Sequence, residues 1–255
     1  MTIREGIILA AGRGTRLRDY IRVPKPLAPL GRFRLIHFPI FSLKVAGVEK
    51  LIMVVRRVAL RFVSKLLGHD RDIEHVVVVN EMPYRENGYS LYLGIENTGG
   101  RFFFVSMADH IYPPKVPQKL LRDLDVDTDI LVAADSMPRF IDIREATKIF
   151  VESGRVKRIG KNIHRFQYID AGLFIMNRSI RRLVASLVKE FEILRVSDII
   201  NHAIDDGYIV RVSDITGLPW IDVDTPKEIN KVLYGEASLL INTIIEKMGG
   251  INEPG

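Results

Sequence analysis

The hydrophobic positions of this sequence form short runs, separated by segments in which apolar residues recur with helical spacing. Apolar runs bounded by turn residues predict strands that are buried on both faces. These runs span 6–10, 51–55, 76–79, 102–105 and 130–134. Helical spacing predicts helices over 36–45, 58–67 and 89–95. Because strand and helix alternate through the first half, we expect an α/β layered fold with a mostly parallel sheet.

The second half of the chain changes character. Segments 147–151 and 156–159 flank Glu152-Ser153-Gly154-Arg155, which predicts a β-hairpin with glycine in its turn. We expect a strand over 171–176 and a helix over 179–191 to follow. Thr225-Pro226-Lys227-Glu228 combines a capping threonine, a proline at the first helical position and a glutamate three residues on, which predicts a helix that begins here and runs to Met248.

The end of the chain is the one linker-like stretch. No internal repeat or low-complexity tract divides the sequence, so we expect residues 1–248 to form one domain and residues 249–255 to be a flexible tail or the stub of a linker. The last helix offers an apolar surface either for packing on the domain, which we favour, or for a homodimer interface. Its apolar residues are Leu239, Leu240, Ile241, Ile244 and Ile245.

Composition narrows the classes of function. With 255 residues, 47% of them hydrophobic, the chain can bury one substantial core. The absence of cysteine excludes disulfides, thiolate zinc sites and cysteine nucleophiles. The sequence contains neither a signal peptide nor an apolar run of about eighteen residues, so we expect a cytoplasmic location without membrane contact from this chain itself.

The charge balance points to an anionic ligand. Lys and Arg number 37 against 31 Asp and Glu, a net charge of +6, which suits a polyanion. The charges are scattered, which disfavours a nucleic-acid surface. The densest basic cluster stands beside a glycine-rich turn and indicates a compact phosphate pocket. Its members are Arg13, Arg16, Arg18, Arg22 and Lys25.

Two motifs carry the candidate chemistry. The segment 9–17, Leu-Ala-Ala-Gly-Arg-Gly-Thr-Arg-Leu, follows the first strand directly, so that successive backbone N–H groups at a strand-to-helix turn can cradle phosphates. It is neither a P-loop nor a dinucleotide fingerprint, because no Gly-Lys-Ser/Thr follows and Leu17 stands where a third glycine would be. Pro24-Lys25-Pro26-Leu27 then presents a lysine from a loop that two prolines stiffen.

Together these motifs resemble those of the sugar-1-phosphate and alcohol-phosphate nucleotidyltransferase family. The resemblance implies a Rossmann-like α/β/α sandwich with a mixed, mostly parallel central sheet, with the hairpin on the acceptor side and residues 1–248 as the nucleotidyltransferase domain. It also implies that the glycine loop wraps the nucleotide, while the arginine and the lysine bind its phosphates. The nucleotide-binding residues expected here are Leu9, Ala10, Ala11, Gly12, Gly14, Thr15, Arg16 and Lys25.

A second segment resembles the base-recognition region of the family's cytidylyltransferase branch, and it is the reason for expecting CTP. Asn80 or Glu81 would pair with the cytosine edge, and Ser90 would cap a helix or bind the base or ribose. Without the resemblance, a loop with an ordinary helix cap is the simpler interpretation. The residues concerned are Asn80, Glu81, Asn87, Gly88 and Ser90.

Three aspartates are candidates for a metal site. Asp109 ends a buried strand, where open α/β sheets bind ligands, and it joins the nucleotide-binding set. Asp222 and Asp224 alternate as on a strand, so they should point to opposite faces. The resemblance selects Asp109 and Asp224 as the ligands of Mg²⁺, which prefers carboxylate and phosphate oxygens, and leaves Asp222 as a structural neighbour. The expected catalytic residues are Arg16, Lys25 and Asp109.

The acceptor is indicated by three more segments, 142–148, 159–161 and 170–174, which resemble archaeal and bacterial CTP:inositol-1-phosphate cytidylyltransferases. Glu145 and Ala171 depart from the D-A-T-K and D-T-G-L-F-like patterns of that branch. The resemblance implies transfer of the cytidylyl group of CTP to inositol 1-phosphate, giving CDP-inositol and pyrophosphate without a covalent enzyme intermediate. Lys148 and Lys161, on the two hairpin arms, would reach the acceptor phosphate and Asp170 its hydroxyls, although solvated hairpin lysines are the plainer interpretation.

Other functions stay open at this stage. The chain can instead be a cytidylyl- or uridylyltransferase for phosphocholine or a hexose 1-phosphate, or a nucleotide-binding regulator without catalysis. Retention of Arg16, Lys25, Asp109 and Asp224 argues against a regulator. Members of the inositol branch are often fused to a membrane-embedded transferase that makes di-myo-inositol phosphate phosphate, so the chain can also be the cytosolic domain of a membrane-anchored protein.

Overall fold

A mixed β-sheet forms the centre of the computed structural model, which describes residues 2–17, 19–68 and 72–249. Arg18 of the predicted basic cluster and residues 250–255 of the predicted tail lie outside the described residues. Within the described chain the sheet has nine strands, in the order β10-β9-β11-β6-β1-β4-β5, with β8 paired to β11 and β12 paired to β8. Seven of these strands are β1 (Glu5–Ala10), β4 (Lys50–Val55), β5 (Glu74–Val79), β6 (Phe102–Met107), β8 (Ile130–Asp135), β11 (Tyr168–Asn177) and β12 (Val210–Asp214).

The direction of these strands agrees with the predicted α/β class. β6, β1, β4 and β5 are parallel, whereas β11 runs antiparallel between β6 and β8. β12 is parallel to β8. The strands expected from apolar runs are thereby confirmed, as is a mixed, mostly parallel sheet.

Alternation along each central strand fills two separate cores. In β1, Ile8 and Ala10 enter one apolar cluster, whereas Ile7 and Leu9 enter the other on the opposite face. The prediction of burial on both faces was wrong for β5, whose side chains are only partly buried. β5 pairs with β4 alone, and an edge strand lacks a second neighbouring strand to cover its outer side.

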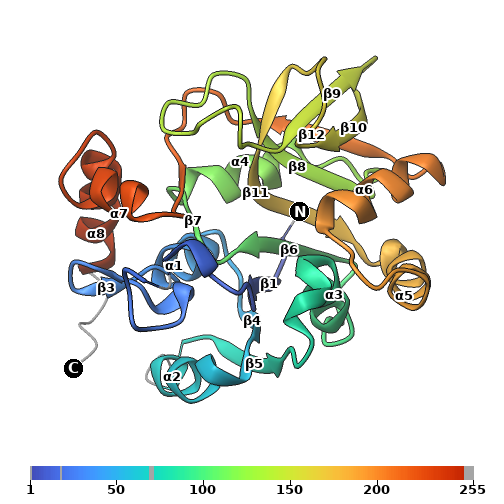
Figure 1. Ribbon diagram of the computed structural model, residues 1–255. Coiled ribbons are helices and arrows are strands. Elements are labelled where there is room, and N and C mark those ends of the chain that lie inside the picture. Colours follow the sequence, from blue (N-terminus) through green and yellow to red (C-terminus); the bar gives the residue numbers. More distant parts are fainter. Residues whose placement is uncertain (1, 18, 69–71, 250–255) are drawn as a thin grey trace.

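Helices cover the two faces of the sheet. One face carries α1 (His37–Val45), α2 (Arg57–Leu67) and α4 (Lys115–Asp123), and the other carries α3 (Glu86–Ile95), α5 (Arg181–Glu190) and α6 (Val196–Asp205). Figure 1 shows the second group to the right of the sheet. The predicted helix over 179–191 consists of a 3-10 turn, η4 (Arg178–Ile180), followed by α5. These three layers confirm the Rossmann-like sandwich.

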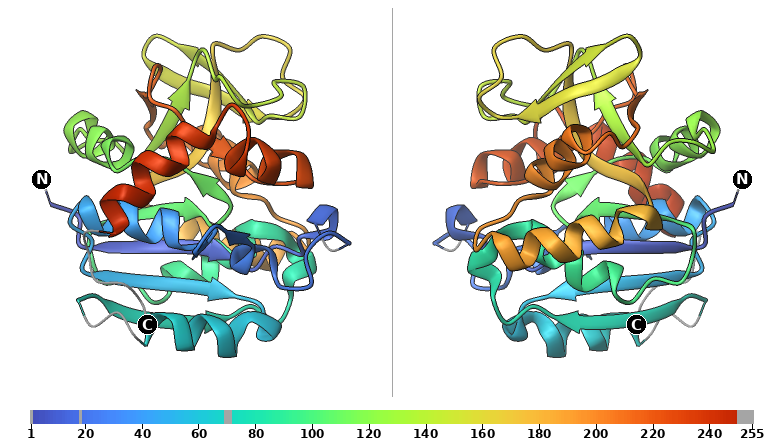
Figure 2. Two further views of the ribbon diagram at one scale, coloured as in Figure 1. Left: turned by 90° about the vertical axis from the view of Figure 1, so that its left-hand side faces the viewer. Right: turned by 90° about the vertical axis from the view of Figure 1, so that its right-hand side faces the viewer.

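The predicted hairpin is present as β9 (Lys148–Glu152) and β10 (Arg155–Gly160). Ser153 and Gly154 have φ of 51° and 74°, the left-handed values that a two-residue hairpin turn needs. β9 pairs with the first residues of β11. Figure 2 shows the hairpin standing at the end of the molecule away from β5.

The C-terminal region corrects one helix prediction. The helix from Thr225 does not run to Met248, but ends as α7 (Pro226–Leu233) and resumes as α8 (Ser238–Gly249). The chain turns at Tyr234 and Gly235, whose N–H groups donate to carbonyls of the last turn of α7. The predicted capping box is confirmed, since the Glu228 side chain accepts from Thr225 N at 2.9 Å.

Helix α8 packs on the body of the protein rather than standing free. Leu240, Ile241, Ile244 and Met248 are buried in a third apolar cluster beside α1 and α7, which confirms the expected core packing, while Leu239 is exposed. None of the described helices is long and apolar enough to cross a lipid bilayer. The remaining short elements are η1 (Thr15–Leu17), η2 (Lys25–Leu27), β2 (Pro29–Leu30), β3 (Phe33–Arg34), η3 (Pro83–Arg85), β7 (His110–Ile111) and β13 (Ile221–Asp222).

Candidate active site

The glycine-rich turn leaves β1 at the carboxyl edge of the sheet. Gly14 has φ of +58°, and a Cβ on it would lie 2.9 Å from Cβ of Lys25, so only glycine lets the turn pass this close. Around Gly12 nothing lies within 4 Å of a Cβ position, so a ligand can approach the backbone there. The turn then closes as η1, which the buried side chain of Leu17 anchors.

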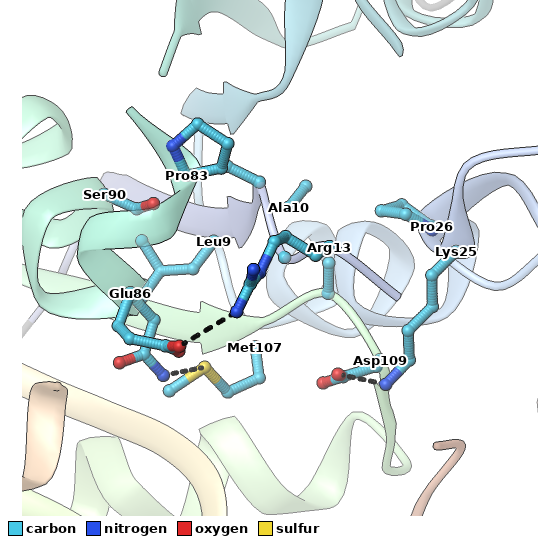
Figure 3. A pocket seen from close by; sticks show the side chains of 14 residues that line it. Leu9, Ala10, Arg13, Lys25, Pro26, Pro83, Glu86, Ser90, Met107 and Asp109 are labelled. Atoms are coloured by element: carbon cyan, nitrogen blue, oxygen red, sulfur yellow. Dashed lines mark hydrogen bonds and ion pairs between the residues drawn. The ribbon is translucent and has the colours of Figure 1, made fainter. Parts of the chain in front are cut away.

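Lys25 lies at the centre of a charged cluster. Its side chain is only 9% exposed, and its ammonium donates to Oδ2 of Asp109 at 2.6 Å and also to Asp224. Asp224 in turn pairs with Arg16 at 3.2 Å. The structure therefore brings together four residues that the sequence singled out from three distant segments. Figure 3 shows the Lys25 ammonium paired with the Asp109 carboxylate.

The ionisation of this cluster follows from its charges. Burial alone would lower the pKa of Lys25, but the negative charges of Asp109, Asp222 and Asp224 outweigh it and raise the pKa above its usual value. Burial alone would raise the pKa of Asp109, but the Lys25 charge and the hydrogen bond from His110 hold it well below its usual range. The lysine is therefore a cation and Asp109 an anion at neutral pH.

The two aspartates near residue 223 do not point to opposite faces, contrary to the prediction. β13 ends at Asp222, where it pairs with His110 of β7, so the strand alternation does not extend to Asp224. Asp222 and Asp224 instead border the same cavity. Ligand atoms of Asp109, His110 and Asp222 lie within 4.8 Å of one another, a spacing that can hold a metal ion.

His110 belongs to this cluster but is not among the residues predicted from the sequence. Its Nδ1 lies 2.8 Å from Oδ1 of Asp109 and 3.9 Å from Oδ1 of Asp222. Burial alone would lower the pKa of His110, but the Asp222 charge and the hydrogen bond to Asp109 raise it to about 9. Burial raises the pKa of Asp222 above its usual value. The signal available in the sequence was only the position of His110 directly after a strand-ending aspartate.

Two adjoining cavities meet at Asp109. The larger, of about 400 Å³, has the size of a small-molecule site, and the smaller measures about 150 Å³. Asn87, Met107 and Asp109 border both. The smaller cavity is otherwise lined by Leu9, Ala10, Ala11, Gly12, Arg13, Lys25, Pro26, Pro83, Glu86, Ser90 and Ala108. Figure 3 looks into it and shows Arg13 facing Glu86, whose charged groups are 4.0 Å apart.

The structure divides the predicted nucleotide-binding residues into two sets. Leu9, Ala10, Ala11, Gly12 and Lys25 line the smaller cavity, as do Asn87, Ser90 and Asp109. Arg16 borders the larger one. Gly14, Thr15, Asn80, Glu81 and Gly88 line neither cavity.

Three of the predicted base-recognition residues have other partners. Asn80 is 1% exposed, and its side chain donates to Oγ of Ser90 and accepts from Met82 N, so its amide is not available to a base. Glu81 pairs with Arg57 at the surface. Ser90 lies within α3 and does not cap it, because the helix begins four residues earlier, at Glu86.

Only two of the three predicted acceptor-binding residues border a cavity. Lys161 and Asp170 border the larger cavity, whereas Lys148 does not. The Lys148 ammonium instead donates to the backbone carbonyl of Lys161 at 2.7 Å, which ties the two arms of the hairpin region together. Burial raises the pKa of Asp170 to about 6.

Comparisons with known proteins place this site in a family. The model of the MobA-like NTP transferase domain matches residues 6–196. A "Bifunctional IPC transferase and DIPP synthase" of Aquifex aeolicus is 32% identical over 250 residues, which cover 97% of this chain and 54% of that protein. A protein of the same name in Rubrobacter xylanophilus is 37% identical over 234 residues, covering 89% of this chain and 51% of that protein. The chain thus spans about half the length of these curated relatives.

Among solved structures, the inositol-1-phosphate CTP transferase from T. maritima superposes with a TM-score of 0.86. It is 30% identical in sequence, and the match covers 96% of this chain and 98% of that chain. With its glycine turn, its lysine and its cavities in the places described above, this chain belongs to the MobA-like NTP transferase family.

Proposed function

We propose that this nucleotidyltransferase joins the α-phosphate of CTP to inositol 1-phosphate, giving CDP-inositol and pyrophosphate. The observation that carries the proposal is the meeting of two cavities at Asp109, whose carboxylate pairs with Lys25. A transferase with two anionic substrates needs both held side by side, with a cationic group and carboxylates at the junction. The names of the relatives and of the T. maritima structure supply the substrate pair.

The smaller cavity fits the nucleotide. The turn at Ala11 and Gly12 offers backbone N–H groups to phosphates, and Lys25 lines the same cavity. Ser90 and Asn87 also line this cavity and supply the polar contacts for the base or ribose. Arg13, beside Glu86, is a second cation at the rim.

The larger cavity fits the phosphorylated polyol. Lys161 provides a cation for the acceptor phosphate, and Asp170 provides carboxyl oxygens for hydroxyl groups. Asp142, Glu145 and Lys227 border the same space and add polar groups that a hydroxyl-rich ring can use. Lys148 supports this cavity indirectly, through the carbonyl of Lys161.

The residues at the junction fit a divalent cation. Asp109, Asp222 and Asp224 offer hard carboxylate oxygens, and Oδ1 of Asp222 is buried without a hydrogen bond in the described structure. In this proposal Asp109 and Asp224 hold Mg²⁺, with Asp222 beside them. When bound, the ion neutralises charge on the phosphates and on the departing pyrophosphate.

The chemistry requires no protein nucleophile and no general base. A phosphate monoester is largely dianionic at neutral pH, so an acceptor oxygen can form the bond to the α-phosphorus while the bond to the β-phosphate oxygen breaks. Lys25 and Arg16 hold the anions in line and stabilise negative charge as pyrophosphate leaves. Residues 1–248 act here as one nucleotidyltransferase domain, and we propose the cytoplasm as its location.

A substrate comparison tests the proposal. Purified protein with Mg²⁺ is given CTP or UTP together with inositol 1-phosphate, phosphocholine or glucose 1-phosphate, and released pyrophosphate is measured. We expect the highest rate with CTP and inositol 1-phosphate, and none with inositol itself, which lacks the attacking phosphate. A higher rate with another pair would reassign the substrates, and no release with any pair would indicate a regulator without catalysis.

A further inference from the structure

The imidazole of His110 makes a hydrogen bond and an aromatic contact to which the proposed chemistry assigns no role. Its Nδ1 is hydrogen-bonded to Oδ1 of Asp109 at 2.8 Å, and its side chain is 13% exposed. The ring stacks on Trp220 with a centroid distance of 5.8 Å and an interplanar angle of 8°. Because a carboxylate can only accept, Nδ1 must be the donor in the bond to Asp109.

A hydrogen bond to a buried aspartate holds Trp220 in place. It is 2% exposed, and its Nε1–H donates to Oδ2 of Asp135 at 2.8 Å. Asp135 is buried at the end of β8, and its other oxygen accepts from Met137 N at 2.8 Å. The indole plane therefore has a set orientation, and the imidazole that lies parallel to it inherits that orientation.

The imidazole also lies directly against Gly172. This glycine has φ of +68°, and a Cβ on it would lie 2.5 Å from Cδ2 of the His110 ring. The ring thus packs against both an indole and a stretch of backbone without a side chain, on the wall of the larger cavity. Such close packing leaves the ring little freedom to rotate or tilt.

We infer that His110, backed by Trp220 and Asp135, is a positioning residue that fixes the Asp109 carboxylate with Oδ2 turned toward Lys25 and the proposed metal site. One oxygen of Asp109 accepts from His110 and the other from Lys25, so the carboxylate is held at both ends. The inference rests on the proposed function, in which Asp109 holds the metal. Groups that orient a metal ligand typically contribute about 10- to 100-fold to metal affinity or to activity.

Three substitutions of His110 distinguish the role of its hydrogen bond from the role of its packing. Phenylalanine in His110→Phe keeps a ring for Trp220 to stack on but removes the donor. Asparagine in His110→Asn removes the stacked ring but places an N–H₂ near the position of Nδ1. Glutamine in His110→Gln places its N–H₂ nearer to Nε2, so it serves as a matched control for His110→Asn.

The principal measurement is binding of Mn²⁺ alone, followed by electron paramagnetic resonance. We expect His110→Phe and His110→Gln to weaken Mn²⁺ binding by about 10- to 100-fold and His110→Asn to recover most of the loss. We expect kcat to fall with Mn²⁺ affinity, while KM for the acceptor stays close to the wild-type value. His164→Phe changes an exposed histidine of the loop after the hairpin. It should leave both the Mn²⁺ affinity and kcat at their wild-type values.

Trp220 provides a second readout, because it is the single tryptophan of the sequence. Its emission should change when Mn²⁺ or Mg²⁺ binds to the wild type, and this response should be lost in His110→Phe. The inference is overturned if His110→Phe binds Mn²⁺ as the wild type does while Asp109→Asn does not. If Asp109→Asn also binds Mn²⁺ normally, the metal assignment of the proposed function fails first. If His110→Phe does not fold, equal affinities in His110→Asn and His110→Gln overturn the inference.

Discussion

The ammonium of Lys25 lies 2.6 Å from Oδ2 of Asp109 and donates to Asp224 as well, so a side-chain cation bridges the two carboxylates proposed to hold the metal. The Lys25 side chain is almost fully buried, and the negative charges around it raise its pKa. This arrangement balances the cluster's charge without a ligand. It also means that one cation serves two purposes: it stabilises the carboxylates, and it faces the cavity proposed for the triphosphate.

Removing either partner of this bridge should slow catalysis strongly. We expect Lys25→Ala and Asp109→Ala each to lower turnover by at least about 10²–10³-fold, because a preorganised group that stabilises developing charge contributes about this much. The check is pyrophosphate release at saturating substrates, with folding confirmed by circular dichroism. Lys119→Ala, which removes a lysine from a surface pair with Asp123, should keep normal turnover. Near-normal rates in both site variants would refute the assigned roles.

The same bridge should oppose metal binding before the nucleotide arrives. In Lys25→Met the carboxylates lose their internal cation, so we expect affinity for Mn²⁺ alone to rise at least about tenfold, although turnover falls. Calorimetry or paramagnetic resonance without nucleotide measures this affinity, again with the equivalent change at Lys119 as control. Unchanged or weaker Mn²⁺ binding in Lys25→Met would show that the lysine does not compete with the ion.

Asn80 should matter for stability and not for base choice. Its amide is buried between Ser90 and Met82, so Asn80→Ala leaves Ser90 Oγ and Met82 N without this partner, at a cost of about 1–3 kcal/mol in the free energy of unfolding. Glu81→Ala, at an exposed surface pair, should change stability by less than about 1 kcal/mol. Urea titrations measure both. A shift in CTP-over-UTP preference in Glu81→Ala would restore the original base-recognition hypothesis.

Local sequence patterns correctly predicted those features of the protein that interactions between residues close in sequence determine. The glycine turn, the proline-flanked Lys25 and the capping box at Thr225 lie where their motifs indicated, because backbone geometry and nearest neighbours determine them. Burial of β5 was predicted wrongly because it depends on which strand is the edge. His110 was missed because its partner Trp220 arrives through the β7–β13 pairing, which neither segment encodes alone.

A comparison of Gly14 with Gly31 distinguishes backbone strain from an effect on the site. Gly14 and Gly31 have φ of +58° and +63°, but a Cβ would meet Lys25 only at Gly14, whereas Gly31 has open space. We expect both Gly14→Ala and Gly31→Ala to lose about 1–2 kcal/mol of stability from backbone strain. Only Gly14→Ala should also lower turnover, by displacing Lys25. Equal turnover in the two variants would mean that the turn tolerates the added methyl group without moving the lysine.

The protein should lose stability in mild acid through His37, at the first residue of α1. Burial lowers the pKa of His37 to about 4 from an ordinary value of 6.5, and its Nδ1 accepts from Arg34 N at 2.7 Å, which only the neutral ring can do. The unfolded chain therefore binds a proton below pH 6.5 that the folded chain refuses until about pH 4. His37 thus contributes its stability above pH 6.5, and this contribution falls as the pH drops toward 4. At about 1.36 kcal/mol per pKa unit, the loss is at most about 3 kcal/mol.

Because carboxylates titrate in the same range, the test is the difference in unfolding free energy between wild type and His37→Gln at pH 7.0, about 5.5 and about 4.5. We expect that difference to shrink as the pH falls, whereas His164→Gln should follow the wild type throughout. A difference that is constant with pH would mean that His37 titrates normally in the folded protein.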